Sequence, residues 1–399
     1  MKFNSFDKLD WKSYTLGELA EEITIRVDNP AKSQFNRFVG LEHFVSGEIK
    51  ISKWSSTSNV TSSAKEFKAG DVLFARRNAY LKRASMVDFD GVCSGDAFVL
   101  RENSHKLTPG FLAFIVNSNS LWDFANANAA GTMSKRVKWR DLKSYTLRIP
   151  PKKEQENIIE LFKEIDNVTE KDSQLYKHLT ICLDSLRNAI FSKKSVHPKN
   201  VYQCDALNEV NLGFLYSVKS QNGIYKPKEF QGRGVRIINM GEIFAFPVIK
   251  DEEMSLIELN EKELSTYLVE EGDLIFARRS LVVEGAGKCS IVGKHSSPMT
   301  FESSMIRVRL DKEKINSKFV YHFLRSKEGR KLIRRIVGFT TVAGITSTDL
   351  AKVVIPLIPL KRQNEIVEIL DNFDAPLHFV EESKRQSRKL HSSLINQVF

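Results

Sequence analysis

An arginine pair ends each of two nearly identical octapeptides in this sequence. Residues 70–77 are GDVLFARR, and residues 272–279 are GDLIFARR. A guanidinium can donate two parallel hydrogen bonds to O6 and N7 of guanine, so arginines at the end of a strand suit the reading of DNA bases. The alternative is that one arginine of each pair forms a structural ion pair. The candidates are Arg76, Arg77, Arg278 and Arg279.

A second set of candidate DNA contacts lies further along each copy. Residues 129–139 (AAGTMSKRVKW) and 337–346 (VGFTTVAGIT) both place Gly and Thr in an irregular loop. Small hydroxyl side chains and backbone N–H groups suit contact with phosphates. The first loop carries its own cations, whereas the second has an arginine pair just upstream. The candidates here are Gly131, Thr132, Lys135, Arg136, Lys138, Arg334, Arg335, Thr340 and Thr341.

The overall charge agrees with an acidic partner. The chain has 399 residues, with 60 Lys and Arg against 49 Asp and Glu, and its net charge is +11. Nucleic acid is the commonest partner of such a basic protein, although a merely basic globular protein is the alternative. Lys82, Arg83 and Arg233 lie in further basic clusters, for which a solvated surface is the competing interpretation.

These residues belong to an internal repeat, which indicates a duplicated fold. The two octapeptides are offset by 202 residues (272 minus 70). Residues 139–166 match residues 347–374 at an offset of 208 (347 minus 139), and residues 38–49 are weakly echoed in 235–244. Three matches in one order predict a unit of about 200 residues, present twice, with a polar linker near 192–202.

Each unit is expected to have a globular front half of mixed α+β structure. Short apolar runs predict strands, and segments in which apolar residues recur every three or four positions predict helices. The strands are expected at 71–75, 97–100, 273–277 and 304–310, and the helices at 108–126 and 316–336. Asp71 and Asp273 are interpreted as structural residues of the turns that enter two of these strands.

The back half of each unit is expected to be helical. Short helices are predicted at about 153–165 and 361–373, after which Asp166 and Asp374 would cap longer helices at 167–192 and 375–398. Narrow apolar stripes favour packing of the two long helices on each other, and packing of each on its own domain is the alternative. The stripes are Val168, Leu175, Leu179, Cys182, Leu186 and Ile190, and Leu377, Val380, Leu390, Leu394 and Val398.

Motifs for catalysis are missing from the sequence. The nearest match to a phosphate-binding loop, EGAGKCS (284–290), has Val282 where the first glycine is needed and Cys289 in place of Ser or Thr. No adenine methyltransferase motif is found, and the histidines and the four cysteines have no metal-ligand spacing. No signal peptide or membrane span is recognised, so a cytoplasmic protein without a membrane partner is expected.

The ordered double set of motifs resembles the specificity subunits of type I restriction-modification systems. The resemblance rests on GDVLFARR with GDLIFARR, and on DLKSYTLRIPPKKEQENI with DLAKVVIPLIPLKRQNEI. In this family a Pro and a Glu-Gln pair open the helix after an extended segment. The first copy matches with Pro151, Glu154 and Gln155, but the second has Arg362 in the Glu position. That departure affects a candidate capping carboxylate.

The resemblance implies an α+β fold with two tandem mixed α+β target-recognition domains, separated by two long, mutually packed antiparallel conserved helical regions. The expected boundaries are 1–150 and 200–358 for the recognition domains, and 151–199 and 359–399 for the helical regions. It also implies double-stranded DNA, two methyltransferase subunits and two restriction/translocase subunits as partners. S-adenosylmethionine, ATP and Mg would bind those subunits, and no cofactor would bind this chain.

The length of the helices gives a further expectation. A helix of 25 residues spans about 37 Å, close to the ~34–36 Å of one DNA turn. Two recognition domains held apart by such helices would read two different short blocks separated by an unread spacer. The competing hypotheses are a DNA-acting enzyme with an unrecognised site, such as a nuclease, and a DNA-binding regulator outside restriction.

Overall fold

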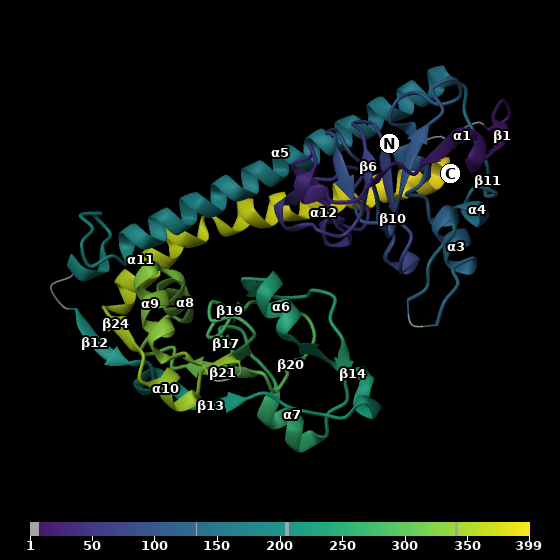
Figure 1. Cartoon of the computed structure of the whole chain (residues 1–399). Helices are drawn as coiled ribbons and strands as arrows, with labels where there is room; N and C mark the ends of the chain where they lie inside the picture. The colour runs from purple at the N-terminus through teal and green to yellow at the C-terminus, as the bar shows by residue number, and fades with distance from the viewer. Residues whose placement is uncertain (1–7, 133, 204–206, 340–341) are drawn as a thin grey trace. The chain divides into compact units, whose positions relative to one another are not determined.

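The structure is a computed structural model that describes residues 8–132, 134–203, 207–339 and 342–399 (Figure 1). These residues form two compact units. Unit 1 comprises residues 1–174 and 381–399, and unit 2 comprises residues 175–380. Each unit therefore combines one globular domain with parts of both long helices, whereas the repeats of the sequence follow one another along the chain.

Unit 1 contains two main sheets and a short ribbon. The order of the four-stranded sheet is β2-β10-β7-β8, and that of the five-stranded sheet is β3-β6-β9-β4-β5. The bounds are β2 Ala20–Ile23, β10 Ala97–Glu102, β7 Val72–Ala75, β8 Ala84–Met86, β3 Arg26–Val27, β6 Ala64–Phe67, β9 Gly91–Cys93, β4 Arg37–Val39 and β5 Ser55–Ser56. The ribbon pairs β1 (Lys12–Thr15) with β11 (Thr146–Ile149).

Short helices cover the four-stranded sheet of unit 1. They are α1 Leu16–Leu19, α2 Phe111–Ile115, α3 Asn119–Ala127 and α4 Trp139–Leu142, with 3-10 turns η1 Pro30–Lys32, η2 Leu41–His43, η3 Thr57–Asn59 and η4 Ala79–Leu81. Aromatic packing joins helix to sheet, because the ring of Trp122 in α3 stacks on Phe74 in β7 with centroids 4.4 Å apart. The predicted helix at 108–126 is therefore confirmed, with a break between α2 and α3.

Unit 2 repeats this plan with additional strands. Its sheets have the orders β13-β21-β17-β19-β15, β16-β14-β20 and β18-β23-β22, and a ribbon pairs β12 with β24. The bounds are β12 Asn208–Asn211, β13 Tyr216–Asn222, β14 Gln231–Ile238, β15 Val248–Ile249, β16 Leu256–Ile257, β17 Leu274–Ala277, β18 Arg279–Ser280, β19 Cys289–Val292, β20 Met299–Phe301, β21 Met305–Leu310, β22 Gly338–Phe339, β23 Ala343–Gly344 and β24 Val354–Leu357. All four predicted strands are present.

The helices of unit 2 also follow the repeat. They are α6 Met240–Ala245, α7 Glu261–Tyr267, α8 Ser317–Arg325, α9 Lys327–Ile336, α10 Ser347–Ala351 and α11 Leu360–Asp371, with 3-10 turns η5 Val201–Gln203, η6 Leu212–Leu215 and η7 Lys228–Phe230. The pair α8 and α9 confirms the helix predicted at 316–336, again with a break. The chain therefore folds its duplicated sequence into duplicated structure.

The Gly-Asp motif of each octapeptide forms a buried ion pair. Asp71 accepts hydrogen bonds from Nε and Nη2 of Arg101, both at 2.8 Å, and from the backbone N–H of Lys68. In unit 2 Asp273 does the same with Arg309 and with the backbone N–H of Glu270. Each carboxylate thus joins a turn to the strand across the sheet, which confirms that these aspartates are structural.

The glutamines of the Pro-rich motifs are buried and bridge three segments. Gln155 accepts a hydrogen bond from the backbone N–H of Thr108 and donates to the carbonyls of Lys106 and Pro150. Gln363 likewise accepts from Asn316 and donates to Ile358. Because a buried amide must satisfy its donors and acceptor, these bonds fix where each helix leaves its domain.

The long helices differ from the sequence prediction. Helix α5 runs without a break from Lys152 to Ile190, so the prediction that Asp166 caps a separate helix was wrong. In the second copy α11 and α12 (Asp374–Val398) are separate, as predicted. Asp374 and Pro376 begin α12, and Pro376 in its first turn lacks the N–H that would be unpaired there.

Within unit 1, α5 and α12 pack antiparallel through a partly polar seam. Asp172 accepts a hydrogen bond from Ser383 at 2.6 Å, and the ring of Phe162 lies 4.9 Å from that of His391. Val168, Leu175 and Cys182 of the predicted stripe are exposed. The prediction of packed helices was right, and the first stripe was right in part. Its residues Leu179, Leu186 and Ile190 are half-buried or buried, but small polar residues such as Thr169 and Ser173 occupy half-buried positions that the stripe left out. In the second stripe Leu390 is exposed.

An asparagine near the end of each long helix caps a helix of a globular domain. In unit 2 the amide oxygen of Asn188 on α5 accepts a hydrogen bond of 2.7 Å from the backbone N–H of Lys327, the first residue of α9. In unit 1 Asn396 on α12 accepts one of 2.8 Å from Asn119, the first residue of α3. Each domain is therefore closed by the helix that belongs to the other repeat.

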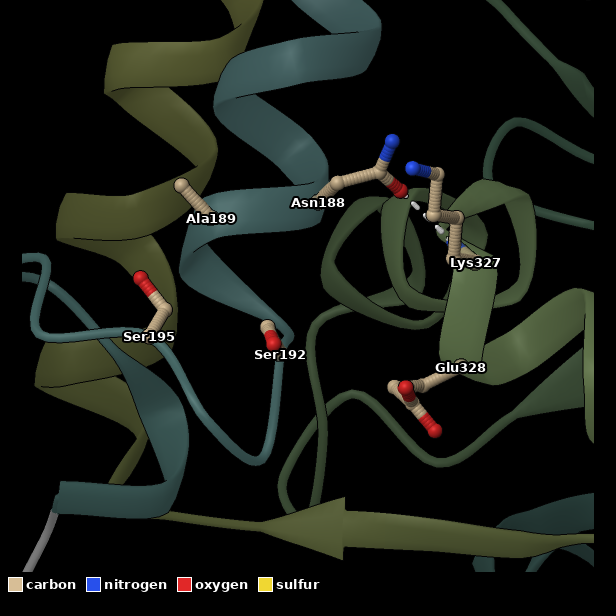
Figure 2. Close-up of a pocket in the computed structure, with 6 residues that line it drawn as sticks. All are labelled: Asn188, Ala189, Ser192, Ser195, Lys327 and Glu328. Carbon is tan, nitrogen blue, oxygen red and sulfur yellow. Dashed lines mark hydrogen bonds between the residues drawn. The ribbon is translucent and has the colours of Figure 1, made fainter.

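A small cavity adjoins the first of these caps. Figure 2 shows Asn188 directed at the start of α9, with Ser192 and Ser195 beyond it. The cavity has a volume of about 250 Å³ and is lined by small polar groups, together with Lys327 and Glu328. Its hydroxyl and amide groups satisfy the polar backbone at the junction.

The two helix–domain junctions differ in polarity. In unit 1 the rings of Phe114 and Phe162 stack with centroids 4.3 Å apart. At the corresponding place in unit 2 the buried His322 lies between Arg187, whose Nη2 is 3.2 Å from its Nδ1, and Asp371, whose Oδ1 is 3.3 Å from its Nε2. Burial lowers the pKa of His322 to about 4.

The buried histidine predicts a loss of stability in acid. Below pH 6.5 the unfolded state takes up a proton that the folded state accepts only near pH 4, so the free energy of unfolding should fall between these values. We expect His322→Asn to remove part of this pH dependence, so that the free energy of unfolding falls by on the order of 1–3 kcal/mol less between pH 6.5 and pH 4. Urea denaturation at several pH values measures it. Exposed His178→Asn should leave the slope unchanged, and equal slopes in all three proteins would contradict the prediction.

Candidate nucleic-acid interface

Three of the predicted arginines in unit 1 surround one carboxylate. Arg136 donates from Nε to Oδ1 of Asp96 at 2.9 Å and from Nη2 to Oδ2 at 3.3 Å. Nε of Arg76 and Nη1 of Arg77 each lie 3.7 Å from an oxygen of the same carboxylate. The hydrogen bond from Arg136, together with the charges of the other two arginines, lowers the pKa of Asp96.

This cluster orients the guanidinium groups without neutralising them. Three cations against one carboxylate leave a net positive charge, and all three arginines keep part of their surface in solvent. A fixed guanidinium loses less conformational entropy when it binds a phosphate or a base. Arg76 and Arg77 therefore form a structural ion pair with Asp96 and still have N–H groups that can donate hydrogen bonds to another molecule. The structural interpretation and the DNA-contact interpretation of these arginines are thus compatible.

The backbone that carries the cluster is the same in both units. In unit 1 Arg77 forms a bridge with Arg136, and the N–H of Val137 donates to the carbonyl of Arg76. In unit 2 Arg279 pairs with Gly344, and the N–H of Ile345 donates to the carbonyl of Arg278. In each unit the arginine pair thus lies beside a segment that is distant in sequence: residues 136–137 in unit 1 and residues 344–345 in unit 2.

The side chains around this shared backbone differ. The N–H of Arg76 donates to the carbonyl of Asp96, whereas the N–H of Arg278 donates to the carbonyl of Ser304. Ser304 therefore replaces the carboxylate in unit 2, and Gly344 replaces Arg136. For this reason the charged groups next to Arg278 and Arg279 differ from those next to Arg76 and Arg77.

The Gly-Thr loop of unit 1 presents its predicted residues to solvent. Gly131, with φ of +124°, and Thr132 are exposed, as are Lys135 and Lys138. The loop is anchored by the N–H of Asn78, which donates to the carbonyl of Lys135. In unit 2 the equivalent candidates Thr340 and Thr341 lie outside the described residues.

The other predicted cations divide into two groups. Arg83 donates to the carbonyls of Leu41 and Arg77, and Lys82 donates to Asn119, so both side chains hold the local structure together. Arg233 forms a short ion pair with Glu258 in a different sheet from the arginine pair of unit 2. Each of these three side chains has at least one protein partner, as the arginines around Asp96 do.

Arg334 and Arg335 are exposed in the last turn of α9. Arg334 lines a cavity of about 520 Å³ in unit 2, together with three more cations, Lys288, Arg325 and Arg330. The sequence analysis missed this cavity and also missed Asp96. No local motif marks either of them, because each joins side chains from several separate segments of the chain.

The Arg136 cluster can be tested directly. We expect Arg136→Ala to weaken binding to duplex DNA by about tenfold, since loss of one charge-assisted contact costs roughly 1–3 kcal/mol. Arg385→Ala is the matched control, because Arg385 is also paired with a carboxylate, that of Glu382, but lies on α12. Fluorescence anisotropy at several salt concentrations measures both variants. Equal affinities for the two variants would contradict a role for Arg136 in DNA contact.

Two further properties of the described part of the chain concern membrane-spanning helices and metal-binding groups. None of its helices combines the length and the apolar character needed to cross a membrane. Within residues 8–132, 134–203, 207–339 and 342–399, no group of three or more His, Cys, Asp and Glu side chains is placed to bind a metal ion.

Comparison with known proteins assigns both repeats to one family. Residues 8–180 and 216–387 match the type I restriction modification DNA specificity domain. The specificity subunit of the type I restriction enzyme StySPI of Salmonella potsdam is 25% identical over 315 residues, which cover 77% of this chain and 67% of that protein. The specificity subunit of EcoKI of Escherichia coli K12 is also 25% identical, over 71% of this chain and 62% of that protein.

Solved structures share the fold across the whole chain. The S subunit of a type I restriction-modification system from M. genitalium has a TM-score of 0.55 at 14% identity and covers 100% of this chain and 98% of its own. A chain from a structure concerned with complex assembly and conformational transition of the type I R-M system has a TM-score of 0.53 at 20% identity, with 97% of each chain covered. With both repeats matched, the chain belongs to the family of type I restriction-modification DNA specificity subunits.

Proposed function

We propose that this specificity subunit reads a bipartite, asymmetric DNA target, with one half-site contacted by each unit. The observation that carries the proposal is the duplicated backbone frame that holds an arginine pair beside a loop, at Arg77 with Arg136 and at Arg279 with Gly344. Two similar frames suit two DNA contacts of the same kind. The match of both repeats to a DNA specificity domain supports this assignment.

The two half-sites should differ in sequence because the two frames carry different side chains. Unit 1 has three arginines around Asp96, whereas unit 2 has Ser304 and Gly344 at the corresponding places. Direct readout depends on which donors reach the base edges, so different donors select different bases. Phosphate contacts by exposed cations such as Lys135 would add affinity without sequence preference.

The long helices are the proposed docking surface for two methyltransferase subunits. Several large apolar residues on these helices are exposed, which is the kind of surface that a protein partner covers. They are Val168, Leu175, Ile181, Phe379 and Leu390. Since the helical motifs are duplicated, one chain can offer two similar docking sites to two copies of one partner.

The catalytic work is assigned to those partners. The methyltransferase subunits would bind S-adenosylmethionine, and two restriction/translocase subunits, which use ATP and Mg, would join for cleavage. The chain itself would bind no cofactor and would select the DNA on which the other subunits act. The names of the relatives as specificity subunits of restriction enzymes support this division.

Methylation mapping tests the proposed function. We would co-express the chain with a methyltransferase subunit of a type I system with which it assembles, in a host that lacks DNA methylation, and then sequence the modified bases. Methylation is expected at one motif made of two different blocks with a fixed spacer, and it should disappear when this chain is omitted. Methylation that persists without the chain would refute the specificity role, and DNA cleavage by the purified chain alone would favour an enzyme.

The spacer length should depend on the long helices. We would insert four residues after Leu175 in α5 and four after Val380 in α12, so that the pairing of Asp172 with Ser383 is kept. One helical turn adds about 6 Å, which corresponds to roughly two base pairs of DNA. The mapped spacer is therefore expected to lengthen while both half-sites stay the same. A matched insertion after Lys194, outside the helices, should change nothing, and altered half-site bases would contradict the proposal.

A further inference from the structure

The turn that follows the arginine pair exposes large apolar side chains in both units. In unit 1 this turn is η4, where Tyr80 and Leu81 are 67% and 38% exposed. In unit 2 Leu281 and Val282, directly after β18, are 87% and 57% exposed. The sequences of the two turns differ, but both expose apolar residues at the same place. This indicates that the two turns have the same function in their units.

The turn in unit 1 is held in a fixed and strained conformation. Asn78 and Lys82, which flank η4, have φ angles of 55° and 48°, and within the described chain they alone among non-glycine residues have positive φ. The backbone N–H of Asn78 is bonded to Lys135, and the side chain of Lys82 is bonded to Asn119. Backbone strain of this kind persists only where the surroundings enforce it, and it concentrates at functional sites.

The turn in unit 2 is fixed by other means. The N–H of Val282 donates to the hydroxyl of Ser280, and the N–H of Gly285 donates to the carbonyl of Val282. Gly287 has a φ of 74°, and a Cβ there would lie 2.4 Å from Ile333, so only glycine fits. Both turns are therefore pre-organised, which reduces the entropy lost when their side chains bind a partner.

Cations surround both turns. In unit 1 they are Arg77, Lys82, Lys135 and Arg136 on the neighbouring segments. In unit 2 Val282 lines the cavity of about 520 Å³ with Lys288, Arg325, Arg330 and Arg334. Two carboxylates also line this cavity, Glu284 and Asp184, but Asp184 is paired with Arg187. The apolar side chains thus lie in positively charged surroundings.

This combination fits DNA better than a protein partner. Interfaces between proteins are depleted of charged residues at their apolar core, whereas protein–DNA interfaces are strongly positive. Around a base pair, phosphates pair with the cations and an apolar side chain can contact the 5-methyl group of thymine in the major groove. Arginines that read guanine approach from the same groove, so both kinds of side chain can act together.

We propose that Tyr80 with Leu81, and Leu281 with Val282, determine specificity by apolar contact with bases, chiefly with thymine methyl groups, next to the arginine pairs. This inference rests on the proposed function, because it assumes that each unit contacts its own half-site. It adds apolar readers to a site for which sequence motifs indicate only cations and hydroxyl groups. Because the two turns carry different apolar residues, they also contribute to the difference between the half-sites.

The first test maps methylation by complexes that carry Leu281→Ala with Val282→Ala. We expect one of the two blocks to lose discrimination at one or two base pairs by about five- to tenfold, and the other block to stay unchanged. That range corresponds to removal of roughly one to two buried methylene-sized contacts. Tyr80→Ala with Leu81→Ala should relax the opposite block. The matched control is Tyr225→Ala with Phe214→Ala, two exposed aromatic residues of unit 2 outside the turn.

The second test does not depend on the methyltransferase. The full-length chain is used to select binders from random duplexes made with thymine and, separately, with uracil, which lacks the 5-methyl group. The wild type is expected to bind selected thymine duplexes about five- to tenfold more tightly than their uracil versions, and the Leu281→Ala, Val282→Ala variant should lose this ratio. A wild type that makes no distinction between the two pools would overturn the inference.

The two tests separate the possible failures. If wild-type complexes methylate no bipartite motif, the proposed function fails, and the thymine–uracil comparison still decides whether the turns contact bases. If the motif is found but every variant keeps it unchanged, the inference fails and the proposed function stands. If the turn variants no longer assemble with the methyltransferase on gel filtration while the control variant does, the turns are a protein-docking surface and the inference is overturned.

Discussion

Each long helix ends in a hydrogen bond to a domain of the other repeat, and the composition of each unit depends on this exchange. Asn188 at the end of α5 caps α9, and Asn396 at the end of α12 caps α3. A helix N-terminus has backbone N–H groups without intrahelical partners, and an amide oxygen supplied by another segment satisfies one of them. The domains are thereby completed by helices that come from distant sequence, so neither repeat of the sequence corresponds to one compact unit.

The proposed reading surface, which comprises the arginine pairs and the hairpins around Arg136 and Gly344, is built on a second repeated interaction inside each sheet. Asp71 with Arg101, and Asp273 with Arg309, join the turn before the central strand to the strand beside it. Removing one partner of such a buried pair would leave a charge without compensation, which is strongly destabilising. These ion pairs fix the start of β7 and of β17, the strands after which the arginine pairs follow. The segment around Arg136 or Gly344 then forms backbone hydrogen bonds with the arginine pair. Rigid support of this kind would let a small number of side chains select among bases, as the proposed function requires.

Duplication with divergence supplies a physical basis for the proposed reading of two different half-sites by one chain. The backbone bonds around Arg76 and Arg278 are the same, but Asp96 is replaced by Ser304 and Arg136 by Gly344. The turns that follow are fixed by strained non-glycine residues in unit 1 and by Gly285 and Gly287 in unit 2. Because the shared bonds involve main-chain atoms, the side chains of the reading surface can change without loss of the frame. The same logic applies to the junctions with the long helices, where stacked aromatic rings in one unit correspond to a buried His322 in the other.

The sequence by itself determined the repeat, the strands that carry the arginine pairs, the helical segments that follow them and the family, because these depend on local periodicity and on identical residues at a nearly constant offset. The breaks within those helical segments came only from the structure. It failed where the outcome depends on distant segments. The unbroken α5 was missed because Asp166 has the residue type of a cap, whereas in the structure it lies inside the helix with its Oδ1 3.6 Å from Nε2 of His391 on α12. The Asp96 cluster and the cavity of unit 2 were decided only by the tertiary structure, since each joins side chains from separate segments. The polar seam of Thr169 and Ser173 was decided there too, because the packing of α12 determines which face of α5 is covered.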